Sequence, residues 1–239
     1  MTESNNNHNN KKWTLALLVN RPESMTFILL IIALIGASML SEYFLDVNYI
    51  LKSFTLTAEL SIAALVLTMV IISGEIDLSA AANIALSACV FAYVQASGIP
   101  IGLAILAGLL AGFLMGALNA ILVIRYQLPS IIVTIGTLIF YRGLAQVIAG
   151  DKSIRVPEWF IGINAKTLLG IPLPVLIFII TAVVLGFILG TTIYGRQIYQ
   201  VGTNNNAALH AGIKSNKIKF GLFILLGVVS AACGIMAAS

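Results

Sequence analysis

Residues 78–124 decide the fold class of this chain, and they read LSAAANIALSACVFAYVQASGIPIGLAILAGLLAGFLMGALNAILVI. These 47 residues contain no Asp, Glu, Lys, Arg or His. A helix needs about 20 apolar residues to cross the hydrocarbon core of a bilayer, so the stretch is long enough for two spans. Ser97-Gly98-Ile99-Pro100 lies between them, and Gly and Pro are typical of a turn. The sequence therefore predicts spanning helices at about 80–97 and 100–124.

The composition of the whole 239-residue chain supports the same class. Hydrophobic residues make up 59% and charged residues 9%, with a mean hydropathy of +1.02. Soluble domains carry about 25% charged residues, so a soluble fold of this size is excluded. Five further apolar runs cover about 25–40, 54–73, 128–149, 172–191 and 220–239. We predict an all-α polytopic transmembrane helical bundle with about seven spans.

The chain begins with a polar segment, residues 1–24, which contains a run of Asn and the pair Lys11-Lys12. We expect a disordered cytoplasmic tail, followed by a membrane domain at 25–239. A cleavable signal peptide is the alternative for 25–40, but the long basic region and the later spans favour an uncleaved span. Cytoplasmic loops are enriched in Lys and Arg. A cytoplasmic N-terminus is predicted because it places eight of the thirteen inside: Lys11, Lys12, Arg21, Arg125, Arg196, Lys214, Lys217 and Lys219.

One predicted span carries a stripe of small residues at every fourth position. The stripe consists of Ala104, Gly108, Gly112, Gly116 and Ala120. Small residues on one helix face allow a neighbouring backbone to approach closely. The stripe therefore predicts tight helix packing and carries no information about a substrate.

A polar segment, SGEIDLS at residues 73–79, separates the second and third runs, and we call it the connector. Asp77 is followed by Leu78-Ser79-Ala80, which suits a residue that caps the next helix. Such a cap satisfies backbone N–H groups where water is scarce. A capped helix start and a direct functional role are both open interpretations of the connector.

A second polar segment, GTNNNAALHAGI, occupies residues 202–213. Asn204 to Asn206 form a helix-start signal, and Gly212 stands where a glycine ends a helix. The pattern predicts a short capped helix between the basic residues Arg196 and Lys214. It is interpreted either as a docking element for a soluble partner or as a surface helix along the membrane.

Glu59 is the acidic residue that lies well inside a predicted span. An ionisable side chain in hydrocarbon costs about 2.5–3.5 kcal/mol on insertion scales and is a functional candidate by default. Snorkelling, or a pair with Arg142 near the end of the fifth run, would also explain it. We therefore regard Glu59 and Arg142 as a possible intramembrane polar site.

The sequence excludes several kinds of chemistry. It contains no Gly-Lys dipeptide and hence no phosphate-binding P-loop. Cys89 and Cys233 stand in apolar runs, His8 and His210 are isolated, and no cluster suggests a metal. We expect no catalytic site and no cofactor on this chain. If the protein's function requires an energy-releasing reaction, a partner would have to carry it out.

Three segments, in order, resemble bacterial ABC-importer permeases of the ribose and simple-sugar class, which includes the rhamnose and autoinducer-2 permeases. The connector is similar to that family's Gly-Gly-Ile-Asp-Leu-Ser signature through Gly74, Asp77 and Ser79, with Glu75 at the second glycine. Residues 128–137 and 141–144 are similar to its fifth-span pattern. The resemblance covers about 50–239 and includes the cytoplasmic coupling segment, at Gly202, Asn204, Ala207, Ala208, Gly212 and Ile213. Residues 202–213 are therefore called the coupling loop below.

The resemblance implies a non-enzymatic permease subunit of the bacterial inner membrane that translocates a monosaccharide. It also implies a cytoplasmic ATPase that holds ATP and Mg²⁺, a second permease subunit as homo- or heterodimer, and a periplasmic or lipid-anchored sugar-binding protein. Closure of the ATPase would push on the coupling loop and open the path inward.

Two departures from the family pattern affect these expectations. Ala80-Ala81 replaces a usual Val-Gly, which leaves the sugar open. Family members continue with further spans beyond the position of Ser239, so we expect the C-terminal spans to be missing. A branched-chain amino-acid ABC permease and an ion-coupled secondary transporter remain the alternatives, and a membrane-embedded enzyme is disfavoured because no catalytic cluster is found.

Overall fold

The computed structural model describes residues 22–150, 160, 162, 166–168 and 170–239. The chain divides into two compact units, residues 1–52 and 53–239, and each is described by itself. Of the predicted tail, residues 1–21 lie outside the described residues, whereas residues 22–24 begin a helix.

The first unit contains helix α2, Pro22–Leu40, and most of α3, Val47–Thr55. Asp46 precedes α3, and its Oδ1 accepts hydrogen bonds from the backbone N–H groups of Asn48 and Tyr49, at 2.7 and 3.2 Å. These bonds satisfy donors that a helix start leaves open, which explains why α3 begins at this point.

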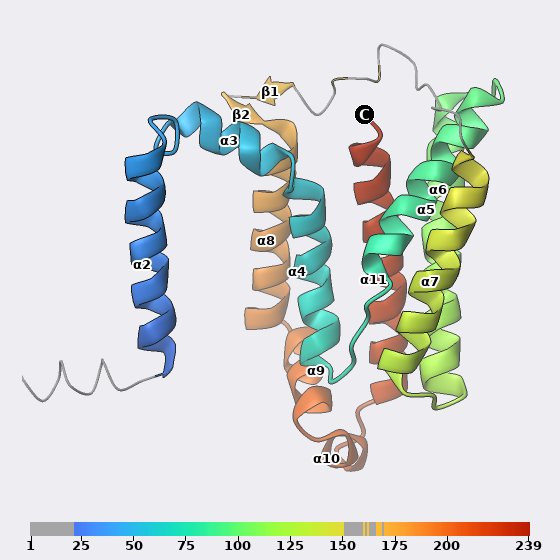
Figure 1. Ribbon diagram of the computed structural model, residues 1–239. Helices are drawn as coiled ribbons and strands as arrows, with labels where there is room; N and C mark the ends of the chain where they lie inside the picture. Colours follow the sequence, from blue (N-terminus) through green and yellow to red (C-terminus); the bar gives the residue numbers. More distant parts are fainter. Residues whose placement is uncertain (1–21, 151–159, 161, 163–165, 169) are drawn as a thin grey trace, which may run out of the picture. The chain divides into compact units, whose positions relative to one another are not determined.

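The second unit is a helical bundle with one small β-hairpin. Its helices are α4 (Ala58–Ile72), α5 (Ala80–Ala96), α6 (Ile101–Ala120), the π-helix η1 (Ile121–Arg125), α7 (Ser130–Ala149), α8 (Leu173–Thr191), α9 (Ile193–Thr203), α10 (Asn205–His210) and α11 (Ser215–Ala237). Strands β1 (Thr167–Leu168) and β2 (Ile171–Pro172) pair antiparallel. Within this unit α11 lies between α4 and α8 on one side and α5, α6 and α7 on the other (Figure 1).

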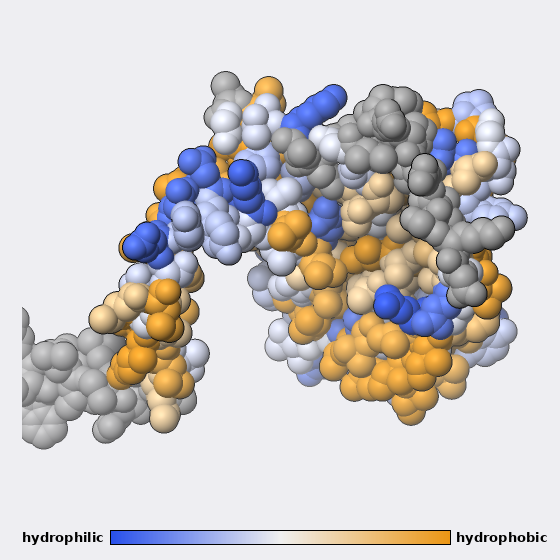
Figure 2. All heavy atoms as spheres, turned by 45° about the horizontal axis from the view of Figure 1, so that its top comes forward, coloured by the Kyte–Doolittle hydropathy of each residue, from blue (hydrophilic) through white to orange (hydrophobic). Residues whose placement is uncertain are grey.

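The all-α polytopic prediction is confirmed, and every predicted apolar run overlaps an α-helix. By length and composition, four helices of the described chain could cross a membrane: α6 with η1, α7, α8 and α11. The bent pair α3 and α4 makes a fifth if it is counted as one span. The described part of α2, Met25–Leu40, and α5 are shorter apolar helices. Apolar residues cover much of the visible face of the larger unit (Figure 2), as expected for a surface that meets lipid.

Several predicted boundaries were wrong. The second run was expected to be one helix over about 54–73, but α3 ends at Thr55 and α4 begins at Ala58. Glu59 therefore lies in the first turn of α4, where a negative charge suits the positive end of the helix dipole. The last helix begins at Ser215 rather than near 220, because a helix continues past the apolar residues that hydropathy detects.

The predicted close packing along the small-residue stripe is confirmed. Helix α6 lies directly against α11, and Gly112 faces the backbone of Gly227. A Cβ atom built on Gly227 would overlap the carbonyl oxygen of Gly112, and one on Gly116 would overlap that of Phe223. The two helix backbones are thus in contact, which a larger side chain at these positions would prevent.

Candidate functional site

The connector begins where α4 ends. The backbone N–H of Ser73 bonds to the carbonyl oxygens of Met69 and Val70, and Gly74 follows with a φ of 86°. That φ lies in the left-handed region, which glycine adopts without steric cost, so the family-motif residue Gly74 ends the helix. The chain then runs without regular structure to α5.

Asp77 is the centre of a buried polar cluster. Its side chain is 3% exposed, and Oδ1 accepts hydrogen bonds from the backbone N–H and the hydroxyl of Ser79, at 2.7 and 2.6 Å. Asn119 of α6 donates from Nδ2 to Ser79 Oγ at 2.8 Å and to Asp77 Oδ2 at 3.4 Å. Tyr141 of α7 donates to the carbonyl oxygen of Met115 at 3.0 Å and to Asn119 Oδ1 at 3.5 Å.

The expected capping role of Asp77 needs correction. Helix α5 begins at Ala80, and the N-cap position belongs to Ser79. Asp77 therefore stands two residues before the cap and stabilises the turn that leads into the helix. Burial raises the pKa of the Asp77 carboxyl, while the hydrogen bonds from Ser79 and Asn119 act in the opposite direction.

The connector also binds α7 and α11. The backbone N–H of Ile76 donates to Ser130 Oγ at 3.2 Å, and Thr134 Oγ1 donates to the Ile76 carbonyl oxygen at 3.3 Å. Glu75 forms an ion pair with Lys219 of α11, with Nζ and Oε1 2.7 Å apart and both side chains 15% exposed. One short segment is thus joined to three helices.

The coupling loop contains the predicted short helix, α10. Asn204 occupies the N-cap position, and its Oδ1 accepts a hydrogen bond from the backbone N–H of Ala207 at 3.0 Å. At the other end Gly212 has a φ of 79°, its N–H bonds to the carbonyl oxygen of Leu209, and the N–H of Ile213 bonds to that of Ala208. This pair of bonds is the Schellman motif, so both predicted helix ends are confirmed.

Helix α9, which precedes α10, was not predicted. Thr192 caps it by accepting a hydrogen bond from the backbone N–H of Gly195 at 3.2 Å. Near its end, Gly202 lies against the last turn of α4, and a Cβ atom at this position would overlap the carbonyl oxygen of Ile72. The coupling loop and the connector therefore meet backbone to backbone.

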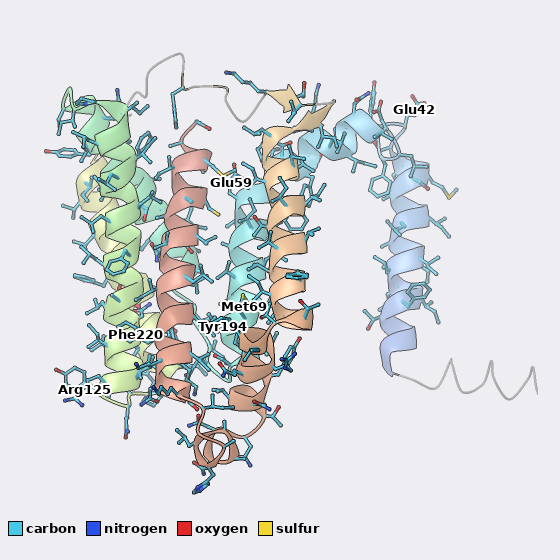
Figure 3. The ribbon with its side chains drawn as sticks, turned by 180° about the vertical axis from the view of Figure 1, so that it is seen from behind. Glu42, Glu59, Met69, Arg125, Tyr194 and Phe220 are labelled. Atoms are coloured by element: carbon cyan, nitrogen blue, oxygen red, sulfur yellow. The ribbon has the colours of Figure 1, made fainter. Side chains whose placement is uncertain are left out.

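The structure does not bring Glu59 and Arg142 together as a pair. Helix α4 packs against α5, α8, α9 and α11, whereas α7 packs against α5, α6 and η1. Glu59 lies in the first turn of α4, at the opposite end of that helix from the connector. In Figure 3 it lies at the opposite end of the unit from Arg125.

Among the described residues no group of three or more His, Cys, Asp and Glu side chains could hold a metal ion. The chemistry that the connector offers is hydrogen bonding and one ion pair, without a nucleophile beside a base. The arrangement can join and position helices.

Comparison with known proteins decides the family. Residues 49–239 match the family model described as "Branched-chain amino acid transport system / permease component". The chain belongs to this permease family. The resemblance to ABC-importer permeases is thus confirmed, and the permease is a polytopic membrane protein.

Curated relatives of this permease include the "Autoinducer 2 import system permease protein LsrD" of Escherichia coli strain K12 and the protein of the same name of Shigella flexneri. Each is 32% identical over 218 residues, which cover 88% of this chain. The chain spans 66% of the length of these relatives. No solved structure matches it.

The sequence did not predict the polar cluster as such. Tyr141 was noted only as part of the fifth-span pattern, and Asn119 was missed, although a polar residue within an apolar run was a signal available for both. Lys219 was counted only as a cytoplasmic charge, although it pairs with Glu75 across 144 positions of sequence. A contact between such distant residues cannot be deduced from the spacing in one sequence.

Proposed function

We propose that this chain is the permease subunit of a binding-protein-dependent ABC importer that moves a ribose-, rhamnose- or autoinducer-2-like monosaccharide. It would act in the bacterial inner membrane, with a cytoplasmic N-terminus. Support comes from the permease family and from relatives named as autoinducer 2 import permeases. The partners would be a cytoplasmic ATPase, a second permease subunit and a periplasmic or lipid-anchored sugar-binding protein.

The single observation that carries this proposal is the shape of α10. A six-residue helix capped at both ends projects at one end of the bundle (Figure 1). Its outer face offers exposed Leu209 and His210, whereas Ala208 is 3% exposed and packs inward beside Ile213. A short capped helix that exposes an apolar and a basic side chain is suited to bind in a cleft on a soluble protein.

In this proposal the residues of the chain bind and move, and they carry no chemical step. ATP and Mg²⁺ belong to the partner ATPase, whose closure would push on α10. Because α10 packs against α9 and α11, the push would reach the spanning helices. The spans would then alternate between outward and inward access for the sugar.

Uptake experiments test the proposal directly. Proteoliposomes that contain the permease, its ATPase and its binding protein should take up labelled ribose, rhamnose or autoinducer 2 when ATP is inside. Uptake should survive a protonophore at constant ATP. Collapse of uptake with the proton gradient would instead establish an ion-coupled secondary transporter.

The docking role of α10 has its own test. Leu209→Glu places a charge on the exposed face and should weaken ATPase binding by about 2 kcal/mol or more, as expected for a central interface residue. Tyr126→Glu, at a residue that is 67% exposed at the same end of the unit, is the matched control. Equal ATPase recruitment by both variants and the wild type in a membrane pull-down would refute the docking role.

A branched-chain amino acid is the second candidate substrate, favoured by the description of the family model. The same proteoliposomes decide between the two classes. An excess of unlabelled leucine should leave sugar uptake unchanged if the carrier is a sugar permease, whereas leucine uptake without sugar uptake would establish the alternative.

A further inference from the structure

We propose that the connector, residues 73–79, is the element that carries movement of the coupling loop to the spanning helices, with Gly202 and the Glu75–Lys219 pair as its positioning contacts. The inference rests on the proposed function, since it needs a partner that moves α10. It assigns to the polar segment a mechanical role that explains its contacts.

The first contact is between backbones. Gly202 of α9 lies directly on the carbonyl oxygen of Ile72, and the Gly202 Cα lies 3.7 Å from the position that a Cβ on Gly74 would occupy. Backbone atoms of α9 and of the end of α4 make this contact. Packed protein interiors are nearly incompressible, so a displacement of α9 has to displace the connector.

The second contact is the ion pair of Glu75 with Lys219, which ties the connector to the first turns of α11. Both side chains are 15% exposed, so the charges are largely shielded from water and their attraction is stronger than on an open surface. Lys219 also lies close to the coupling loop in sequence, which ends at Ile213. The pair therefore fixes the connector and the loop to one helix.

The remaining contacts lead away from the loop. Ser130 and Thr134 connect the Ile76 backbone to α7, and Asn119 connects Asp77 to α6. These links are hydrogen bonds of side chains, which can lengthen or exchange partners in a small shift. A displacement that enters at Gly202 would thus leave the connector through α6 and α7.

The site has room for such a shift. A cavity of about 340 Å³ lies beside the ion pair. Its polar lining includes Glu75, Ser130, Asn205, Asn216 and Lys219, from the connector, α7, α10 and α11. A space shared by these elements lets the ion pair move without a clash between backbones.

The test measures the distance between spin labels on Val183 of α8 and Ile132 of α7, both exposed, in the complex with ATPase and binding protein. Cys89 and Cys233 are first replaced by Ala. In the wild type, ATP with vanadate should change this distance. In Gly202→Ala the ATPase should stay bound, while the change becomes at least about twofold smaller and ATP-driven uptake falls at least about fivefold.

Gly190→Ala is the matched control, because a Cβ atom on this glycine of α8 meets no atom within 4 Å. It should behave as the wild type. An unchanged distance shift and uptake in Gly202→Ala would overturn the inference, and so would loss of ATPase binding, since Gly202 would then belong to the docking surface.

Charge reversal tests the role of the connector if the Gly202→Ala variant does not fold and is not found in the membrane. Glu75→Lys should reduce the distance shift, and the double variant Glu75→Lys with Lys219→Glu should restore it. Failure of the double variant to exceed the single one would overturn the inference. A wild-type complex that neither binds ATPase nor responds to ATP would refute the proposed function itself.

Discussion

At the α6–α11 interface two helix backbones meet at glycines, whereas at the connector side chains bridge the helices through hydrogen bonds and an ion pair. The glycine interface has no side-chain degree of freedom and admits one distance between the helices. At the connector, in contrast, polar side chains such as Asn119 have more than one hydrogen-bond partner. The same two helices are therefore held rigidly along their length and adaptably at one end.

The largest expected effect comes from the rigid interface. Gly227→Ala should destabilise the protein by about 3 kcal/mol, because the added methyl group overlaps the Gly112 backbone and the core cannot relax around it. Gly221→Ala on the same helix meets no atom within 4 Å and should be neutral or slightly stabilising. Thermal unfolding in detergent measures both, and equal melting temperatures would contradict the backbone contact.

A somewhat smaller effect is expected at the polar cluster. Asn119→Ala removes the amide that donates to Asp77 and Ser79 and leaves a buried carboxylate short of one donor. We expect a loss of about 2 kcal/mol in the free energy of unfolding. Asn216→Ala, at an exposed residue of α11, serves as control and should change it by less than about 0.5 kcal/mol. A loss no greater than that of the control would show that the cluster adds no stability.

The pH dependence of stability tests whether Asp77 of this cluster is desolvated. Burial raises the pKa of Asp77 above its ordinary value of 3.8, so the folded protein favours the protonated carboxyl. The stability that this preference gives is fully present below pH 3.8 and is lost as the pH rises through the raised pKa. The wild type should therefore lose stability relative to Asp77→Asn as the pH rises above about 4. Parallel melting curves of the two proteins across this range would show that Asp77 is not desolvated.

The capping bond of α10 has an effect of intermediate size. Asn204→Ala removes the side-chain acceptor for the Ala207 N–H and should cost about 1 kcal/mol, concentrated in this helix. Amide exchange of residues 205–210 should quicken, while that of α6 and α11 stays unchanged. Asn206→Ala, inside α10, is the control, and identical exchange in the two variants would contradict the cap.

The stability effect of the ion pair should be no larger than that of the cap. Glu75→Gln keeps the size of the side chain and loses the charge, so we expect a change of about 1 kcal/mol, at the upper end of the range for exposed pairs because both side chains are only 15% exposed. Lys219→Met should have a similar effect, and the double variant should cost less than the sum of both. Strict additivity of the two changes in unfolding experiments would show that the pair contributes nothing.

The sequence alone predicts features that repeat with the helix period and features that depend on residues close together in the chain. The stripe from Ala104 to Ala120 indicates a close helix contact because its spacing matches the helix period, and Asn204 and Gly212 mark the ends of α10 because capping is a local interaction. Glu59 was predicted to lie well inside a span, rather than in the first turn of a helix, because hydropathy does not detect the break before Ala58. Lys219 and Asn119 reach the connector through tertiary packing, which a single sequence does not reveal.

The shortness of α10 has a consequence for association kinetics. A helix of six residues is too short to be stable alone in water, so it exists here because its two ends are capped and the chain around it is fixed. A partner that grips it would meet a surface that is already ordered and would not lose conformational entropy in folding it. Encounters would then succeed without a slow ordering step, and the lifetime of the complex would depend on the exposed side chains of Leu209 and His210.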